Sequence, residues 1–247
     1  MQEKPTAYID EMQDFVLDEY DVECSRQVIY QTLREAEWSR KVVSKHAKER
    51  SQLLRDLFYL RSRSWRIDQI VALDESAANE RSCDRKRGWS MKGESCIAPY
   101  SAKRSERWSI LPAQTIDGYL AVEVFQGSID HERFENFLEH QVLPRCTPFP
   151  GPRSIILLDN AKIHVRPRVK EPCQRAGVLV EYLPPYSPDL NPIEQSFKVL
   201  KDWLRKHYAE IDAFDSFVSF LFYAIDECCT SHNSRGYFKR CGYIMDI

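Results

Sequence analysis

Three acidic residues stand where a folded chain can deliver catalytic carboxylates. Two apolar runs, residues 67–73 and 154–158, are typical of buried strands, and they end on Asp74 and Asp159. Glu194 lies early in a helix-compatible stretch that follows the last predicted strand. If the two strands are adjacent and parallel, both aspartates lie at the same edge of the sheet, where open α/β sheets place their sites, and Glu194 can lean over that edge.

This arrangement predicts a site for divalent cations. Three carboxylates in close contact repel one another and cannot all stay ionised unless cations neutralise them. Oxygen ligands without Cys or His select Mg²⁺, with Mn²⁺ as a substitute. Two such ions, about 3.5–4 Å apart, activate a water or a 3′-hydroxyl and stabilise the leaving oxygen of a phosphodiester displacement. Alternatively, each acid is a helix cap or a surface residue, but a caged acid at the end of an apolar strand is costly unless it is paired or metal-bound.

The rest of the pattern predicts the frame that positions these acids. Residues 108–115 and 119–125 are β-rich runs joined by Asp117-Gly118, a dipeptide typical of a tight hairpin. Helical periodicity after Ser128 and at 167–176, a strand at 178–183 and a helix entered through Pro192 complete the order. We therefore expect an α/β fold, with a mixed five-stranded sheet flanked by helices and preceded by a small all-α head.

The strings around the three acids resemble a known family. They are LDES at 73–76, LDNAKIH at 158–164 and LPPYSPDLNPIE at 183–194. These strings resemble the three catalytic blocks of Tc1/mariner-type transposases of the IS630-like branch, which are DDE superfamily endonucleases; 34 residues separate the second and third acids, as in that family. The resemblance covers residues 6–245. It implies a ribonuclease-H-like catalytic domain whose triad, Asp74, Asp159 and Glu194, binds two Mg²⁺ ions.

Two further acids lie close to the triad in the sequence. Asp189 is an alternative third acid, but it lies in a loop bounded by prolines, and we expect it to be a turn residue. Glu75 follows Asp74, so continued strand geometry would point its side chain to the opposite face. We expect Glu75 at the rim of the core rather than among the metal ligands.

Three other neighbours are candidates for supporting roles. Asn160 and His164 can orient the loop after Asp159 or touch a phosphate, although a satisfied structural histidine would look the same. Asn191 precedes Pro192 and can cap the helix that carries Glu194. None of these three is expected to react with the substrate.

The N-terminal 66 residues change sharply in charge. Residues 1–25 carry one Lys against eight acids, whereas residues 26–66 carry eleven Lys and Arg against four acids. We expect a helix from about residue 6 to 19, a short turn, and a second helix capped by Ser25. Residues 1–45 are thus predicted to be a partial helix-turn-helix domain, 46–66 a basic helical linker and 67–247 the catalytic domain.

The second helix of this head resembles the recognition helix of the helix-turn-helix and winged-helix region in the same transposases. Such a helix places polar side chains at base edges while nearby cations bind phosphate. The candidates are Arg26, Gln27, Tyr30, Arg34, Arg40 and Lys41. An amphipathic structural helix is the alternative. Family members carry a further helix-turn-helix unit upstream, so we expect this chain to be a truncated or decayed copy or to come from a gene model that lost an exon.

A basic stretch follows the first predicted strand. Residues 81–107 hold eight Lys and Arg against three acids. A loop of this charge beside an acidic site can hold the DNA backbone, with an affinity that falls steeply as salt rises. The residues expected to do so are Lys86, Arg87, Lys92, Lys103 and Arg104. A solvated surface loop is the alternative.

Composition excludes several classes of protein. A chain of 247 residues with 43% hydrophobic and 12% aromatic residues has enough apolar surface for a folded core, so whole-chain disorder is excluded. Its eight cysteines form no CxxC pair, which argues against a disulfide scaffold or a zinc site. There is no run of 18 apolar residues and no signal-peptide pattern, so we expect an intracellular protein without a membrane partner.

Taken together, the sequence predicts a metal-dependent DNA transposase or endonuclease. The resemblance implies that it cuts double-stranded DNA at the terminal inverted repeats of a transposon, joins the freed 3′-ends to a TA target, and works as a homodimer on DNA. It also implies a nuclear location in a eukaryote, or the cytoplasm with the nucleoid otherwise. The alternatives are a catalytically silent DNA-binding protein derived from such an element, and an RNA-directed nuclease on the same fold.

Overall fold

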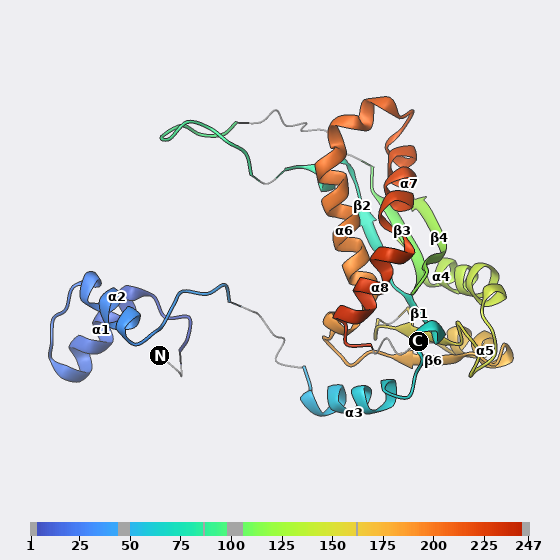
Figure 1. Ribbon diagram of the computed structural model, residues 1–247, viewed down its shortest axis with the longest axis horizontal. Coiled ribbons are helices and arrows are strands. Elements are labelled where there is room, and N and C mark those ends of the chain that lie inside the picture. Colours follow the sequence, from blue (N-terminus) through green and yellow to red (C-terminus); the bar gives the residue numbers. More distant parts are fainter. Residues whose placement is uncertain (1–3, 44–49, 86, 98–105, 162, 244–247) are drawn as a thin grey trace. The chain divides into compact units, whose positions relative to one another are not determined.

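The computed structural model describes residues 4–43, 50–85, 87–97, 106–161 and 163–243 (Figure 1). Its contacts divide the chain into two units, Met1–Lys48 and Glu49–Ile247. Across the described ranges, no helix is both long and apolar enough to cross a membrane. Of the predicted DNA-binding residues, Lys86, Lys103 and Arg104 lie outside the described residues.

The first unit consists of two short helices, as predicted. Helix α1, Ile9–Tyr20, begins three residues after Thr6, where the Glu11 carboxylate accepts a hydrogen bond from the Tyr8 N–H at 2.7 Å. Helix α2, Arg26–Glu35, is capped by the Ser25 hydroxyl as expected. Neither helix contains a buried residue.

The second unit is built on one mixed sheet. The strands are β1 Ile70–Leu73, β2 Ser76–Ala78, β3 Trp108–Thr115, β4 Gly118–Gln126, β5 Ile155–Leu158 and β6 Leu179–Tyr182. Their order is β2-β3-β1-β5-β6, with β4 paired to β3. The described residues thus form six strands, so the expectation of five was wrong. The missed strand, β2, is only three small residues long and carries no hydrophobic alternation.

Strand direction matches the expectation that placed the two aspartates together. β1 and β5 are adjacent and parallel, with Val71 opposite Ile156, and all four residues of each strand are buried. β6 pairs with β5 in parallel, whereas β3 runs antiparallel to β1 and forms the predicted hairpin with β4. Asp74 and Asp159 therefore leave the sheet at the same edge.

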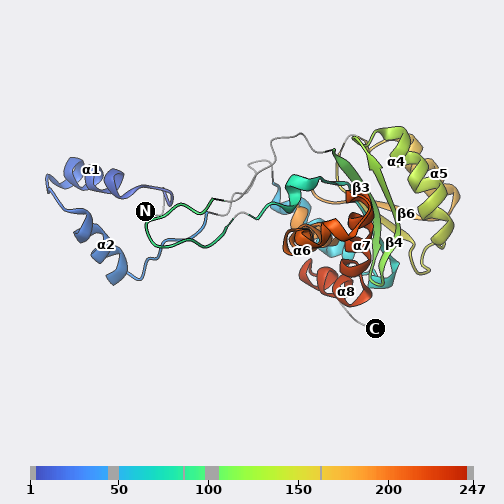
Figure 2. The same ribbon diagram turned by 90° about the horizontal axis from the view of Figure 1, so that it is seen from above.

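Helices cover both faces of the sheet (Figure 2). Helices α4 His131–Phe137 and α5 Pro167–Arg175 lie on one face, and α6 Pro192–His207, α7 Phe217–Cys228 and α8 Ser231–Arg240 on the other. A π-helical turn, Leu138–Val142, continues α4. Short 3₁₀ turns complete the unit: η1 Ile67–Gln69, η2 Glu80–Cys83, η4 Leu143–Arg145, η5 Pro188–Leu190 and η6 Tyr208–Ala213.

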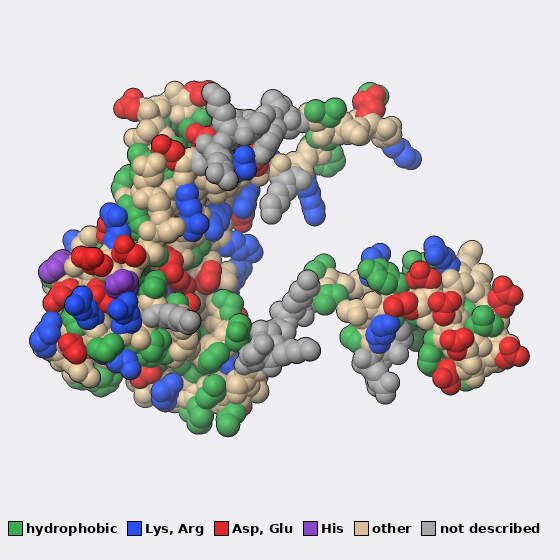
Figure 3. Space-filling model, turned by 180° about the vertical axis from the view of Figure 1, so that it is seen from behind, with side chains coloured by type: hydrophobic (Ala, Val, Ile, Leu, Met, Phe, Trp, Pro, Cys, Tyr) green, Lys and Arg blue, Asp and Glu red, His purple; other side chains and the backbone are tan. Residues whose placement is uncertain are grey.

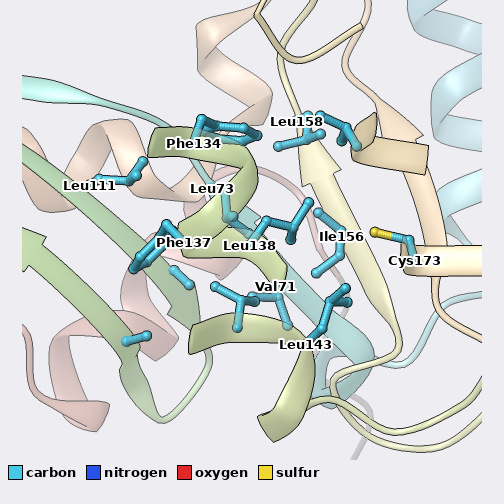
Figure 4. Close-up of a cluster of buried hydrophobic side chains, with 14 of the residues drawn as sticks. Val71, Leu73, Leu111, Phe134, Phe137, Leu138, Leu143, Ile156, Leu158 and Cys173 are labelled. Atoms are coloured by element: carbon cyan, nitrogen blue, oxygen red, sulfur yellow. The ribbon is translucent and has the colours of Figure 1, made fainter. Parts of the chain in front are cut away.

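Three clusters of buried side chains hold these layers together. Figure 4 shows the first, in which Phe134 and Phe137 of α4 cluster with Leu73 of β1 and Ile156 of β5. The other two clusters join the opposite face of the sheet to α6, α7 and α8. Burial of this kind is the main favourable term in folding, and it fixes the central strands that deliver the aspartates.

Most of the predicted linker, residues 49–66, belongs to the second unit. Helix α3, Gln52–Ser62, is capped by Ser51. Its Phe58 is 1% exposed and belongs to the same buried cluster as Ile70 of β1, and its Arg55 is also buried. The basic, helix-compatible pattern of residues 46–66 predicted a linker that ends at residue 66. Packing places the boundary before α3 instead.

Candidate active site

Asp74 is held at the end of β1 by two hydrogen bonds. One carboxylate oxygen accepts the Glu75 backbone N–H at 2.8 Å, and the other accepts the side-chain amide of Asn191 at 2.9 Å. The residue is only 9% exposed. Burial and the nearby charge of Asp159, with smaller contributions from Glu75 and Glu194, raise the pKa of Asp74 to about 7.

Asp159 follows β5 in the same way but has a different environment. Its Oδ1 accepts hydrogen bonds from the Ala161 backbone N–H at 2.8 Å and from Nδ1 of His164 at 2.6 Å. Burial favours the neutral acid, but these two hydrogen bonds outweigh it and lower the pKa of Asp159. Asp159 is therefore ionised at neutral pH, next to the less easily ionised Asp74.

His164 joins Asp159 to Glu75, which was predicted to lie at the rim of the core. The ring is fully buried, its Nε2 lies 3.3 Å from Oε2 of Glu75, and its centroid lies 4.4 Å from that of Phe134. Burial favours the neutral ring, but the hydrogen bond with Asp159 and the ion pair with Glu75 raise the pKa of His164 to about 9. As predicted, Glu75 points to the other face of the sheet from Asp74: it pairs with His164, which packs on Phe134 of α4, whereas Asp74 is held by Asn191 at the start of α6.

Glu194, the last residue of the third block, lies at the start of helix α6. Pro192 occupies the first turn of α6, as predicted, and Glu194 lies in the same turn. Burial raises the pKa of Glu194; Lys201 opposes this shift and the charge of Asp159 adds to it. The three acids thus lie near enough to affect one another's ionisation.

Asn191 and Asn160 tie the three catalytic blocks together. Asn191 occupies the N-cap position of α6, but its side chain makes no cap hydrogen bond and donates to Asp74 instead, so its predicted capping role was wrong. The Asn160 amide donates to the Leu183 carbonyl, which links the loop after β5 to the end of β6. Neither partner is near in sequence, so neither contact follows from local pattern.

Asp189 pairs with two arginines and does not join the three acids. Its two oxygens accept hydrogen bonds from Arg55 at 3.1 and 2.8 Å, and Arg50 adds a second ion pair at 3.1 Å. Burial favours the neutral acid, but Arg55 and Arg50 lower the pKa of Asp189. It lies in η5, which agrees with the prediction of a turn residue. Sequence reasoning missed both arginines, and no local signal links them to a loop more than 130 residues away.

The three carboxylates are suitable ligands for divalent cations, but their side chains are not grouped around a common point. Among the residues that the structure describes, no three Asp, Glu, His or Cys side chains are grouped closely enough to hold a metal ion. The negative charges of Asp159 and Glu194 nevertheless both disfavour ionisation of Asp74. A divalent cation would relieve that repulsion, and carboxylate oxygens are the ligands that Mg²⁺ and Mn²⁺ prefer.

The predicted DNA-binding residues within the described ranges are accessible. On and after α2, Arg26, Gln27, Tyr30, Arg34, Arg40 and Lys41 are all exposed. In the basic loop, Arg87 and Lys92 are exposed. The guanidinium of Arg85 donates to the carbonyls of Arg205 and Lys206 at 3.2 and 2.9 Å, which fixes the start of this loop to the end of α6. Accessibility permits phosphate contacts, and the DNA-binding roles stay predictions.

Comparison with known proteins gives consistent matches. A family model described as DDE superfamily endonuclease matches residues 69–217, more than half of the chain. An uncharacterized protein of Sinorhizobium fredii, y4pE/y4sA, is 38% identical over 55 residues, which are 22% of this chain and 38% of that protein. The chain therefore spans well under two thirds of that relative's length.

Solved structures share the fold over nearly the whole chain. The Mos1 transposase paired-end complex with the left transposon end has a TM-score of 0.65 at 21% identity, over 97% of this chain and 76% of that chain. The Mos1 mariner paired-end complex with Mn has a TM-score of 0.64 at 20% identity, with the same coverage. The Mos1 strand transfer complex reaches 0.62 at 20% identity, over 95% and 74%. The predicted ribonuclease-H-like fold is thereby confirmed.

Proposed function

Because the chain belongs to the DDE superfamily of endonucleases, we propose that it is a DNA transposase of the Tc1/mariner type. In this proposal it cuts double-stranded DNA at the terminal inverted repeats of a transposon and joins the ends to a TA target. The catalytic acids are Asp74, Asp159 and Glu194. Low-identity likeness to Mos1 shows the fold, and the description of the matched Mos1 complexes as paired-end and strand transfer complexes supports DNA as the substrate.

One observation carries the proposal. Two adjacent parallel strands, β1 and β5, end on aspartates at one edge of the sheet, and Glu194 approaches them from the first turn of α6. The charge of Asp159 raises the pKa of both Asp74 and Glu194, so the three carboxyl groups lie close enough to interact, which isolated surface acids would not do. A site of this kind needs a cationic cofactor before a phosphodiester can approach it.

Mg²⁺ or Mn²⁺, held by Asp74, Asp159 and Glu194, would activate the attacking oxygen and stabilise the leaving one. Two solved Mos1 complexes are described as containing Mn or Mg, which supports this choice. The protein's own part is positional. Asn191 orients the Asp74 carboxylate, and His164 orients Asp159 while engaging its Oδ1, so that Oδ2 is the oxygen left for a ligand.

Exposed cations supply the DNA contacts in this proposal. Arg87 and Lys92 extend from the second unit, and the polar face of α2 offers Arg26, Gln27 and Arg34 to DNA. Dimerisation on DNA would bring two ends together. The second candidate, a silent DNA-binding protein, would keep these contacts and lack cleavage.

Cleavage of supercoiled plasmid that carries candidate inverted repeats tests the proposal. Mn²⁺ or Mg²⁺ is added at a concentration on the order of millimolar, which suits weakly bound hard cations. We expect nicking and linearisation that Asp74→Asn, Asp159→Asn and Glu194→Gln each abolish. Asp226→Asn is the matched control, because Asp226 is an exposed acid on α7. Salt-sensitive binding without cleavage would favour the silent protein, and cleavage of an RNA–DNA hybrid alone would favour the RNA-directed nuclease.

A further inference from the structure

Helix α3 is oriented against the usual hydrophobic rule. Leu53, Leu57 and Leu60 are 68%, 47% and 63% exposed, whereas Arg55 on the inner face is 5% exposed. Figure 3 shows hydrophobic side chains on the outer surface at the lower end of the second unit, where α3 lies. Burial of the leucines would favour a different rotation of the helix. Phe58 is the apolar residue buried on the inner face, so the charged Arg55 buried beside it needs a specific partner there.

That contact is a two-pronged ion pair with Asp189. Nη1 and Nη2 of Arg55 lie 3.1 and 2.8 Å from the two carboxylate oxygens, and Nη2 also donates to the Tyr59 hydroxyl at 3.3 Å. Arg50 adds a second guanidinium to the same carboxylate. A bidentate arginine pair fixes both distance and orientation, which a lysine cannot do.

Asp189 is two residues from Asn191 and five from Glu194. The Asp189 segment, η5, leads directly into α6, and the Glu194 N–H bonds back to the Asn191 carbonyl at 3.3 Å. Tyr243 holds the same segment from another side, because its hydroxyl donates to the Leu190 carbonyl at 3.0 Å. The Asn191 amide then reaches Asp74. An unbroken series of contacts thus leads from α3 to two of the three acids.

We propose that Arg55 is a positioning residue of the active site, which acts through Asp189 to hold Asn191 against Asp74 and Glu194 at the edge of the sheet. This inference rests on the proposed function. A buried arginine paired with a half-exposed acid adds little net stability, because desolvation offsets the attraction. What the pair supplies is a fixed geometry for a loop that has only short 3₁₀ structure of its own.

The test compares Arg55→Met and Arg55→Lys with Arg61→Met in the full chain. Arg61 is the matched control, because it lies on the same helix and makes an exposed ion pair with Glu181 at 3.5 Å. Mn²⁺ affinity is measured by electron paramagnetic resonance, and DNA cleavage is measured on the same samples. Thermal unfolding without metal confirms that each variant is folded.

We expect Arg55→Met to weaken Mn²⁺ binding about 10-fold or more, the scale seen for residues that support metal ligands, and to lower kcat in proportion. Arg55→Lys keeps the positive charge but lacks the planar guanidinium, so its Mn²⁺ affinity should lie between those of Arg55→Met and the parent. Asp189→Asn should match Arg55→Met, and the double variant should lose no more than either single variant, because both act through one contact. Arg61→Met should bind Mn²⁺ like the parent.

Two failures are distinguishable. If folded Arg55→Met binds Mn²⁺ as tightly as the parent, the positioning role is overturned while the proposed function stands. If Arg55→Met does not fold, Arg55→Lys and Asp189→Asn decide by the same measurement. A parent protein that binds no Mn²⁺ overturns the proposed function and this inference together.

Discussion

The two units of this chain are stabilised in different ways. The second unit buries three apolar clusters around one sheet, and its central strands are completely enclosed. In the first unit, α1 and α2 contain no buried residue, and large side chains such as Phe15 and Tyr20 are 57% and 68% exposed. Helices of 12 and 10 residues are marginal in water without a packed face.

This difference indicates a division of labour. A site that positions three repelling carboxylates needs a rigid frame, and the second unit provides one. A recognition helix needs accessible side chains, and α2 provides those at the expense of its own packing. If the first unit binds DNA as proposed, part of its stability comes from the complex.

The largest expected change is a loss of stability when a core side chain is truncated. Ile156→Ala in β5 should lower the free energy of unfolding by about 2–5 kcal/mol, because the side chain is fully buried. Ile29→Ala in α2 makes the same chemical change at a partly exposed position and should cost less than about 1 kcal/mol. Denaturant unfolding followed by circular dichroism measures both. Equal losses would mean that α2 belongs to a packed core.

The second prediction is a gain in stability, at Asp74 in the candidate active site. Without divalent cations, Asp74→Asn should raise stability at pH 8 by about 1–2 kcal/mol, because it removes a buried, repelled charge. The Asn191 amide can rotate to accept from the new amide, since its Oδ1 has no hydrogen-bond partner among the described residues. The folded-state pKa of Asp74 is raised, so the gain is full above about pH 7 and shrinks as pH falls toward 3.8.

Thermal unfolding with a chelator measures this gain, with Asp226→Asn as the control. No gain at pH 8, or a gain that grows as the pH falls, would contradict the account. The same variant should lose Mn²⁺ binding, which would place stability and function in opposition at Asp74.

Local pattern predicted those parts of the fold that depend on neighbouring residues. The apolar runs before Asp74 and Asp159 and the Asp117-Gly118 hairpin were confirmed, because burial and turn chemistry are encoded within a few residues. Contacts between distant blocks could not be predicted. The pairing of Asn191 with Asp74 spans 117 residues and depends on how the sheet and α6 meet.

The same distinction applies to individual residues near the site. Glu75 lies on the predicted face, but its pairing with His164, 89 residues away, could not be predicted from local pattern. Arg55 fell within the predicted basic helical linker, whereas it is buried and paired with Asp189, 134 residues away. The roles of Asp74, Asp159 and Glu194 came from residue type and spacing, and they stay predictions.

A smaller effect is expected at the Asp189 ion pairs. Asp189→Asn should cost about 1 kcal/mol at pH 7, a modest figure because half of the carboxylate side chain is exposed and screened. The folded-state pKa of Asp189 is lowered, so this contribution is present above 3.8 and is lost as pH falls through the lowered value. Unfolding of parent and variant from pH 7 to pH 2 should therefore converge at the acid end. A constant difference across that range would assign the effect to something other than the charge.

The smallest effect should follow removal of the whole first unit. Residues 49–247 contain all three buried clusters, so their unfolding free energy should change by less than about 0.5 kcal/mol when residues 1–48 are removed. Calorimetry of both proteins measures the difference. A large loss would show that the two units are energetically coupled and not independently stable.

The central claim is that Asp74, Asp159 and Glu194 together hold divalent cations. Crystals of the full chain grown with Mn²⁺ test it through the anomalous difference map. The account predicts a peak bound by oxygens of all three side chains, at roughly the 2.0–2.2 Å expected for small hard cations. A map without a peak at that edge of the sheet under saturating Mn²⁺, or with Mn²⁺ bound only elsewhere, would contradict it.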